Sequence, residues 1–538
     1  GHYELWTCGK ISNFQMAFLF QKINKLDGDY ENILDFFRKL TQKIKGQFAI
    51  VFFCNEFVFA ASDKLSSIPL FYYHSQNKMI IGNQAVPIKE YANLKSTDTD
   101  KRAYLEIAMS GFTIGNKTIF KNLYQLCAGE FIFFSNNTLT KEYYFSYLSS
   151  SNFVSNSINL NKQFTEVLEE SFSELIELSS GRQIAIPLSA GNDSRLIASG
   201  LKHLGAKDVI CFSYGARNSG EVKISRAVSK KLGYKWFNVP ISYKSQREFF
   251  LSDEFLSYKN IFNFLSSTPF VQDISVIKEI FNNKLISQNA IIVNGNTGDF
   301  ISGGHIPKSL FKNNFKITKE NLLKESWSDY LEKHYSLWGI LRNRINDEYL
   351  INELTNLAKY RDKLSNDDIS EIPGFFESLE FLGRQTKYIV NMQRAYEFYG
   401  YSWFMPLWSE SMINFWKNVP FSSKLNQKLY KETIHENNWG GVWNEIPVNK
   451  VIIKPAFLRY SRLLCKLMIY PYSKNAWSKF ERNVFAYHLD NVKNSTIVPY
   501  QKVLFDTRGQ RHWLSWLTEI YLYENGMENI MELKKGIK

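Results

Sequence analysis

The chain has 538 residues, of which 44% are hydrophobic and 22% charged, a composition that excludes a disordered or fibrous protein. At about 150 residues per domain, this length predicts two to four domains. The 65 Lys and Arg residues exceed the 52 Asp and Glu residues by 13, an excess that suits polyanionic partners but, over so long a chain, fits a role in solubility better.

Three further features bear on the compartment of the protein. The sequence has no run of 18 or more apolar residues, so we expect no transmembrane helix. Its five cysteines lie far apart and form no C-x-x-C pair, which argues against a disulfide framework and against a zinc site. The N-terminus shows no signal-peptide pattern and begins with Gly1 rather than Met, as a fragment would. We therefore expect a reduced, cytoplasmic protein.

The first 143 residues or so are predicted to be rich in β-strands. Apolar runs of strand length occupy residues 47–53 and 57–61, and the polar turn between them predicts a hairpin. Shorter apolar runs follow at residues 71–73, 79–81 and 130–134. The polar stretch 146–161 has the composition of a linker, so a domain boundary is expected there.

After this linker the pattern changes to strands that alternate with helices. Residues 183–188 predict a short buried strand that leads into a polar loop and then a helix. Further strands are predicted at residues 209–214 and 289–294, with a helix over residues 221–232 between them. Such alternation is typical of a parallel sheet covered by helices. The rest of the chain is predicted to be mainly helical.

The polar loop at residues 189–194 carries the strongest local signal for chemistry. A loop between the carboxyl end of a parallel strand and a helix N-terminus gathers backbone N–H groups, and the helix dipole favours an anion there. Gly191 permits close backbone approach, while Ser189 and Ser194 offer hydroxyl groups. Asp193 would repel a phosphate unless a divalent cation lay between them, so Mg²⁺ is implied. An ordinary strand-to-helix turn uses the same residue types, and from the loop alone both interpretations stay open.

This loop resembles a known sequence motif. Ser189-x-Gly191-x-Asp193-Ser194 is similar to S-G-G-x-D-S, the pyrophosphate loop of the asparagine synthetase family, with Ala190 in place of one glycine. That loop belongs to enzymes that split ATP into AMP and pyrophosphate. The resemblance implies that these residues bind the pyrophosphate portion of ATP.

A second segment strengthens the resemblance. Residues 295–305 are similar, position for position, to G-D/E-G-G-D-E-L-F-G-G-Y of the same family, and an apolar strand precedes them. Asp299 falls on the aspartate that holds Mg²⁺ together with the loop aspartate, and Gly298 falls on a glycine of the nucleotide site. Asn296 and Phe300 replace acidic residues, so the differences from the family gather on the acceptor side of the site.

A third segment also differs on the acceptor side. Residues 400–407 align with the family pattern G-x-E-x-R-x-P-F, but Ser402 and Phe404 stand at the glutamate and arginine positions. A substrate other than aspartate is therefore expected. Glu397, about one helical turn earlier, is a substitute carboxylate, although a solvent-facing helix residue is the interpretation we favour.

A fourth segment, in a basic part of the chain, resembles a family motif that contains a lysine. Ile452-x-Lys454-x-x-Phe457 resembles R-x-K-x-x-F, which places Lys454 on the lysine that stabilises the departing pyrophosphate, with Lys450 as the fallback. The stretch 454–482 interleaves basic and aromatic residues. A solvated helical face is predicted for this stretch, and contact with a membrane-bound or phosphorylated substrate is the alternative.

The first 145 residues resemble the class II glutaminase domain of the same family. Residues 8–13, which contain Gly9, are similar to N-G-E-I-Y-N, and Asp29 falls on the aspartate of D-x-E-x-x-L, which grips the amine of glutamine. Residues 46–49 and 62–72 match G-x-F-A and R-D-x-x-G-x-x-P-L-Y-Y. The resemblance implies that Gly9 and Asp29 are the remnant of a glutamine site.

The nucleophile of that domain is absent from the sequence. In the family it is an N-terminal cysteine, well before the motif around Gly9, whose free amine serves as base. Cys8 lies inside a predicted strand and is interpreted as a packed strand residue. Either the chain is a fragment whose front carries the cysteine, or it has lost glutaminase activity. We favour a fragment and expect no glutamine hydrolysis by the chain as given.

Together these resemblances predict an α/β protein with two main units. A truncated class II glutaminase-like αββα domain is expected over residues 1–145 and a linker over residues 146–161. An asparagine-synthetase-like ATP-pyrophosphatase domain is expected over residues 162–538, with a parallel sheet of the adenine nucleotide alpha hydrolase type and helical C-terminal additions.

The implied activity is that of an AMP-forming carbon–nitrogen ligase. With ATP and Mg²⁺, a carboxylate would become an acyl-adenylate and then, with ammonia or glutamine as nitrogen donor, a carboxamide. A helix like residues 391–400 occurs in members associated with bacterial surface polysaccharide, so the expected acceptor is a uronic acid on a nucleotide or lipid carrier. No nucleic-acid partner is expected, and a homodimer is compatible with the resemblance. The implied residues are Ser189, Gly191, Asp193, Ser194 and Gly298 for pyrophosphate, Asp193 and Asp299 for Mg²⁺, and Lys454, Asp193 and Asp299 for catalysis.

Two other interpretations stay open. An intramolecular lactam or macrolactam synthetase would use the same adenylation chemistry, and the missing glutaminase nucleophile favours it. A non-catalytic relative would keep the fold without the activity, but the intact pair Asp193 and Asp299 argues against it.

Overall fold

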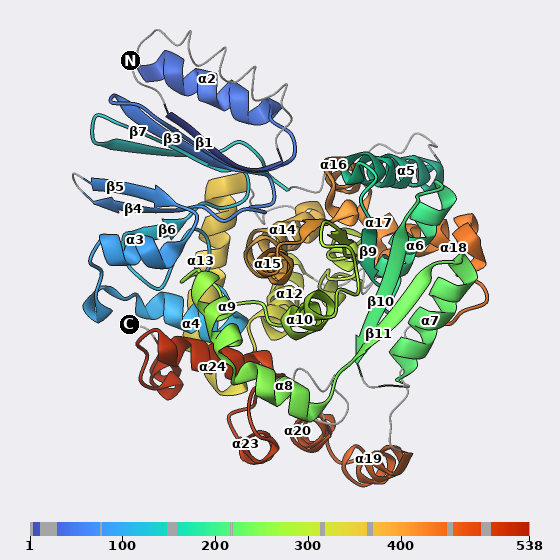
Figure 1. Cartoon of the computed structure of the whole chain (residues 1–538). Coiled ribbons are helices and arrows are strands. Elements are labelled where there is room, and N and C mark those ends of the chain that lie inside the picture. The colour runs from blue at the N-terminus through green and yellow to red at the C-terminus, as the bar shows by residue number, and fades with distance from the viewer. Residues whose placement is uncertain are drawn as a thin grey trace.

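The computed structural model in Figure 1 shows two packed lobes, a first lobe up to residue 147 and a second lobe from residue 159. The residues it describes are 4–10, 30–75, 78–147, 159–215, 217, 219–311, 318–362, 369–448, 456–485 and 496–536. Asp29, Lys450 and Lys454, which the sequence singled out, lie outside these described residues.

The first lobe contains two antiparallel sheets in adjacent layers (Figure 1). The larger sheet has the order β1 (Glu4–Lys10), β2 (Gln47–Phe53), β3 (Phe57–Ser62), β7 (Glu130–Ser135) and β8 (Thr138–Tyr143). The smaller sheet has the order β5 (Lys78–Gly82), β4 (Phe71–Ser75) and β6 (Leu123–Gln125). Helix α2 (Tyr30–Lys43) covers the outer face of the larger sheet, and α3 (Ala85–Tyr91) and α4 (Lys101–Ser110) lie beyond the smaller one.

Strand β2 shows why both faces of the larger sheet are apolar. Side chains alternate between the faces of a strand, and Phe48 and Ile50 belong to the core under α2, whereas Ala49 and Val51 face the space between the sheets. The α2 side of that core centres on Phe37, whose ring stacks on that of Phe59 at 3.9 Å between centroids. A strand that is buried on both faces has a continuous apolar run in its sequence, as residues 47–53 do.

The second lobe is built on a five-stranded parallel sheet. Its order is β11 (Lys235–Pro240), β10 (Val209–Gly215), β9 (Ile184–Pro187), β12 (Ile291–Val293) and β13 (Ser402–Phe404). Figure 1 shows α6 (Asp193–His203) and α7 (Gly220–Leu232) on one side of the sheet, and α10 (Ile274–Asn282) and α15 (Arg394–Phe398) on the other. The chain runs from β9 outward to β10 and β11, then returns to β12 on the other side of β9, so the strand order reverses between β9 and β12. Ligands bind at such switch points in open parallel sheets.

The remaining helices surround this sheet and join the lobes. They are α5 (Leu160–Ser179), α8 (Tyr243–Phe250), α9 (Asp253–Ile261), α11 (Gly298–Ile301), α12 (Lys319–His334), α13 (Arg344–Asp362), α14 (Ile372–Glu380), the π-helical segment η5 (Phe381–Tyr388), α16 (Glu410–Lys417), α17 (Phe421–Lys424), α18 (Lys428–Asn437), α19 (Ala456–Ile469), α20 (Lys474–Val484), α23 (Tyr500–Phe505) and α24 (Leu514–Glu524). Within the ranges described, no helix combines the length and the apolar character needed to cross a bilayer.

The two lobes share one continuous core and several polar contacts. A single hydrophobic cluster contains Phe71 of the first lobe together with Phe381 of the second. The Lys387 ammonium in η5 donates to the Thr113 hydroxyl and to the Gly115 carbonyl, both at 2.6 Å. The predicted fold class is therefore confirmed: layered αββα sheets in the first lobe, and a parallel α/β sheet with helical additions in the second.

Candidate functional site

The candidate site lies at the carboxyl edge of the two central strands of the parallel sheet. The loop after β9 leads into α6, which begins at Asp193, and the loop after β12 leads into α11, which contains Asp299. Because β9 and β12 are neighbours and parallel, both loops emerge at the same edge, at the point where the strand order reverses. The structure therefore brings together the two segments that the sequence separates by about a hundred residues.

The loop after β9 is closed by its own hydroxyl groups. The Ser194 hydroxyl accepts a hydrogen bond from the Ser189 backbone N–H at 3.0 Å and lies 3.0 Å from the Ser189 hydroxyl. The Ser189 hydroxyl in turn accepts from the Gly191 N–H at 3.1 Å. These bonds hold the loop at the N-terminus of α6, where the helix dipole and unpaired N–H groups favour an anion.

Two glycines allow the second loop to lie directly against Asp193. A Cβ at Gly298 would lie 2.7 Å from Asp193 Cγ, and a Cβ at Gly295 would lie 2.7 Å from Asp193 Cβ. Real Cβ atoms do not approach other atoms so closely, so no larger residue fits either position without movement of a loop. Packing alone therefore requires glycine at position 298, whether or not this residue contacts a ligand.

The two carboxylates of the site repel each other. Burial, followed by the negative charge of Asp299, raises the pKa of Asp193 to about 7. The Tyr430 hydroxyl donates to Asp193 Oδ1 at 2.7 Å, and the Asp299 backbone N–H also donates to this carboxylate. Two carboxylates held together at an anion-binding helix end are the donor set that Mg²⁺ uses when phosphate oxygens and water complete its coordination. The residues present fit the predicted ion, which Asp193 and Asp299 would hold.

The exposed side chain of Asp299 begins a series of acids and histidines that leads into the core. His305 Nε2 lies 2.8 Å from Asp299 Oδ2, and His305 Nδ1 lies 2.5 Å from Glu380 Oε1. His334 Nε2 lies 3.3 Å from the other oxygen of Glu380. Burial would lower the pKa of His305, but the charges of Glu380 and Asp299 raise it to about 9. Burial alone would raise the pKa of Asp299, but the His305 imidazolium lowers it.

Two further cations act on this end of the site. Burial lowers the pKa of Lys333 on α12, while the charges of Glu380 and Asp299 raise it. The positive charge of Arg384 in η5 also acts to lower the pKa of Asp299. Within the described ranges Arg384 makes no hydrogen bond or ion pair. Arg384 thus adds a positive charge close to Asp299.

The sequence did not reveal Glu380, Lys333 or Arg384 as site residues. They come from α14, α12 and η5, which lie outside the sequence motifs. A π-helical segment such as η5 also has no sequence pattern that would predict it. Such segments are frequent at functional sites. His305 was the last residue of the second motif, at the position of the family's tyrosine, and nothing in the pattern assigned it a role.

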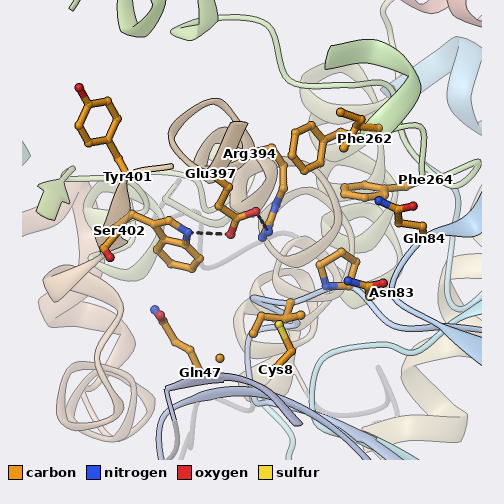
Figure 2. Close-up of a pocket in the computed structure, with 15 residues that line it drawn as sticks. Cys8, Gln47, Asn83, Gln84, Phe262, Phe264, Arg394, Glu397, Tyr401 and Ser402 are labelled. Atoms are coloured by element: carbon orange, nitrogen blue, oxygen red, sulfur yellow. Dashed lines mark hydrogen bonds and ion pairs between the residues drawn. The ribbon is translucent and has the colours of Figure 1, made fainter. Parts of the chain in front are cut away.

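Glu397 differs from its prediction as a solvent-facing residue. Glu397 Oε2 accepts from Arg394 Nη1 at 2.5 Å and its Oε1 accepts from Trp403 Nε1 at 2.8 Å. With Ser402, which begins β13, it lines a cavity of about 360 Å³ between the lobes (Figure 2). Phe404 ends the same strand and is buried. Glu397 is therefore a fixed wall of the interlobe cavity.

The opposite wall of this cavity belongs to the predicted remnant of the glutamine site. Figure 2 shows Cys8 and Gln47 across from Arg394 and Glu397. Gly9 has a φ of +109°, and a Cβ there would lie 2.2 Å from the Gln47 carbonyl oxygen, so the position requires glycine. Cys8 lies in β1 as predicted, but its side chain is exposed and lines the cavity, so its interpretation as a packed residue is wrong.

Comparison with known proteins identifies both parts of the chain. The sequence model described as a glutamine amidotransferase domain matches residues 5–145, and the model described as asparagine synthase matches residues 163–436. No curated protein sequence matches the chain.

Several solved structures show a likeness. The allosteric regulatory enzyme of purine biosynthesis is 12% identical, with 44% of this chain and 60% of that chain covered and a TM-score of 0.18. The Bacillus subtilis glutamine phosphoribosylpyrophosphate amidotransferase, complexed with ADP and GMP, is 11% identical, with 55% and 61% covered and a TM-score of 0.17. The NH₃-dependent NAD synthetase of Campylobacter jejuni is 16% identical, with 42% and 93% covered and a TM-score of 0.20.

The chain thus spans about three fifths of the first two of these structures. The asparagine synthase model covers half of the chain and contains both Asp193 and Asp299. The chain belongs to the asparagine synthase family.

Proposed function

We propose that this protein is an ATP-dependent, AMP-forming ligase that converts a carboxylate into an amide. The observation that carries the proposal is the approach of Asp193 to Asp299 across Gly298, at the N-terminus of α6. An anion cradle and two carboxylates in one place suit a nucleotide triphosphate bound with its divalent ion.

In the proposed reaction an acceptor carboxylate oxygen attacks the α-phosphorus of ATP. The bond from that phosphorus to the bridging oxygen of the β-phosphate breaks, and pyrophosphate leaves. An amine nitrogen then attacks the acyl carbon, the bond to AMP breaks, and the nitrogen loses a proton. Ser189, Gly191 and Ser194 would surround the pyrophosphate. Bound Mg²⁺ would supply charge neutralisation for the phosphate oxygens.

The acceptor we propose is an acidic sugar, such as a uronic acid on a nucleotide or lipid carrier. The cations Lys333 and Arg384 near Asp299 support a substrate with more than one negative charge. Lys454 keeps its proposed role beside the departing pyrophosphate, by resemblance alone. The nitrogen donor is proposed to be ammonia or glutamine, in keeping with the amidotransferase match over residues 5–145.

Exchange of labelled pyrophosphate into ATP tests the activation step. The protein is incubated with ATP, Mg²⁺ and one carboxylate at a time, including aspartate and UDP-linked uronic acids, and EDTA provides the metal-free control. We expect exchange that requires both Mg²⁺ and an acidic sugar. Exchange with aspartate alone would contradict the proposed acceptor, and exchange that persists in EDTA would contradict the proposed use of Mg²⁺.

A substitution at Gly298 tests whether the contact between the loops matters. Gly298→Ala should lower the exchange rate about a hundredfold, because the added methyl group would meet Asp193 Cγ and Leu407 Cδ1 at 2.7 Å and force the loops apart. Gly82→Ala is the matched control, since its Cβ would meet Ile88 at an ordinary 3.5 Å. Equal exchange rates in the two variants would show that the close approach of the loops is dispensable.

A further inference from the structure

Helix α19 presents a large apolar surface to solvent. Six of its 14 residues are large apolar side chains with exposed fractions between 52% and 69%. They are Phe457, Tyr460, Leu463, Leu464, Leu467 and Met468. The sequence predicted a solvated helical face here, but the outward positions of this helix are apolar. In Figure 1 α19 lies at the rim of the molecule, beside α20.

The exposed side chains of α19 form one continuous stripe. At about 100° per residue they fall within an arc of roughly 140° around the helix axis. Ser461, Cys465 and Leu458 lie next to one edge of this stripe and are only partly exposed. Arg462 binds α20, where its Nε lies 2.6 Å from Glu481 Oε1 and its guanidinium lies over the Trp477 ring. The helix is therefore anchored to α20 on one side, and no element among the described residues packs on its apolar side.

The sequence around the stripe is basic. Residues 446–480 contain seven Lys and Arg and no Asp or Glu. Arg459 and Lys466 lie beyond one edge of the apolar arc. Tyr470 and Tyr472 are exposed just beyond the end of the helix. An apolar face bordered by cations, with aromatic residues at its margin, is the pattern of helices that lie in the plane of a membrane surface.

We propose that α19 binds the surface of an anionic lipid bilayer, with its apolar stripe among the acyl chains and its cations at the headgroups. The charge complementarity selects this partner, because a second copy of the chain would bring the same positive charge against the first. At 14 residues the helix is about 21 Å long, which suits a position along the surface. The segment lies outside residues 163–436, so the family match does not account for it.

Vesicle flotation with the full chain tests this proposal without reference to its enzymatic activity. Vesicles of phosphatidylcholine alone are compared with vesicles in which about one third of the lipid is phosphatidylglycerol. We expect the protein to float with the anionic vesicles only, and to be released at high salt. Equal binding to both vesicles, or to neither, would overturn the proposal.

Variants in the stripe and at its edge separate the apolar contribution to membrane binding from the electrostatic one. Leu464→Glu with Leu467→Glu should lower the partition coefficient into the vesicles about a hundredfold or more, because the free energy gained by burying each leucine side chain is lost. Arg459→Gln with Lys466→Gln should lower it roughly 25-fold, at about fivefold per cation. Leu251→Glu with Leu256→Glu, at two other exposed leucines, in the α8–α9 region, is the matched control and should bind like the parent chain.

Circular dichroism of each variant serves as the folding control, and we expect the helix content to be unchanged. Loss of binding in the control pair as well would mean that the stripe has no special role and would overturn the proposal. Sedimentation velocity without lipid tests whether the stripe instead forms a contact between two copies of the chain. If the parent chain self-associates and Leu464→Glu with Leu467→Glu abolishes this, the stripe is a contact between copies and the proposal fails.

Discussion

Asp193→Asn is expected to lower ATP–pyrophosphate exchange by about a thousandfold or more while the fold is kept. The substitution retains the size of the side chain and a carbonyl oxygen for the Tyr430 hydroxyl, which lies 2.7 Å from Asp193 Oδ1. It removes one of the two negative charges that face each other across Gly298. Because charge stabilisation at a preorganised phosphate site contributes heavily to catalysis, the loss falls on the reaction rate.

The measurement is the exchange rate at saturating ATP, with Mg²⁺ varied over a wide range. Asp253→Asn is the matched control, because Asp253 is an exposed aspartate in the first turn of α9 and should leave exchange unchanged. Unfolding curves of both variants should overlay that of the parent chain. Normal exchange in Asp193→Asn would remove Asp193 from the proposed site.

Glu377→Leu is expected to lower the free energy of unfolding by about 3–5 kcal/mol. Lys424 Nζ lies 3.0 and 3.1 Å from the two carboxylate oxygens of Glu377, and both side chains are 3% exposed or less. The leucine would leave the Lys424 ammonium buried without this counter-charge. The pair also lies behind the second motif, where a Cβ at Gly303 would meet the Lys424 carbonyl oxygen at 2.5 Å.

A double-mutant cycle distinguishes the charge effect from simple loss of packing. Lys424→Met alone should be similarly destabilising, whereas Glu377→Leu with Lys424→Met should recover most of the loss, because neither charge then remains buried. Urea unfolding followed by tryptophan fluorescence supplies the free energies. Lys39→Met removes the exposed pair of Lys39 and Asp35, 2.6 Å apart, and should cost less than about 1 kcal/mol. Additive losses in the double variant would contradict the buried-charge explanation.

The meeting of Asp193 and Asp299 was predictable from the sequence, because each follows an apolar strand and parallel strands end at one edge. The two apolar faces of β2 also follow from its continuous apolar run. Glu380 and Arg384 were not predictable in this way. They reach Asp299 through the packing of α14 and η5, which no local pattern encodes.

Periodicity could not predict two exposed features of the molecule. Periodicity indicates which side chains share a face, but it does not say whether another element covers that face. The face of β1 that carries Cys8 remains open because the two lobes leave a cavity beside it. The apolar stripe of α19 is open because no described element packs on it. Both features depend on tertiary arrangement beyond the strand or helix concerned.

The π-helical segment η5 has a mechanical consequence for the whole molecule. Lys387 is fixed to Thr113 and Gly115 of the first lobe, and Arg384, three residues earlier in the same segment, acts on Asp299 in the second. The contact between the lobes and the position of the Arg384 charge near Asp299 therefore depend on the same short piece of backbone, and a change in η5 at the interface would also reach the candidate site.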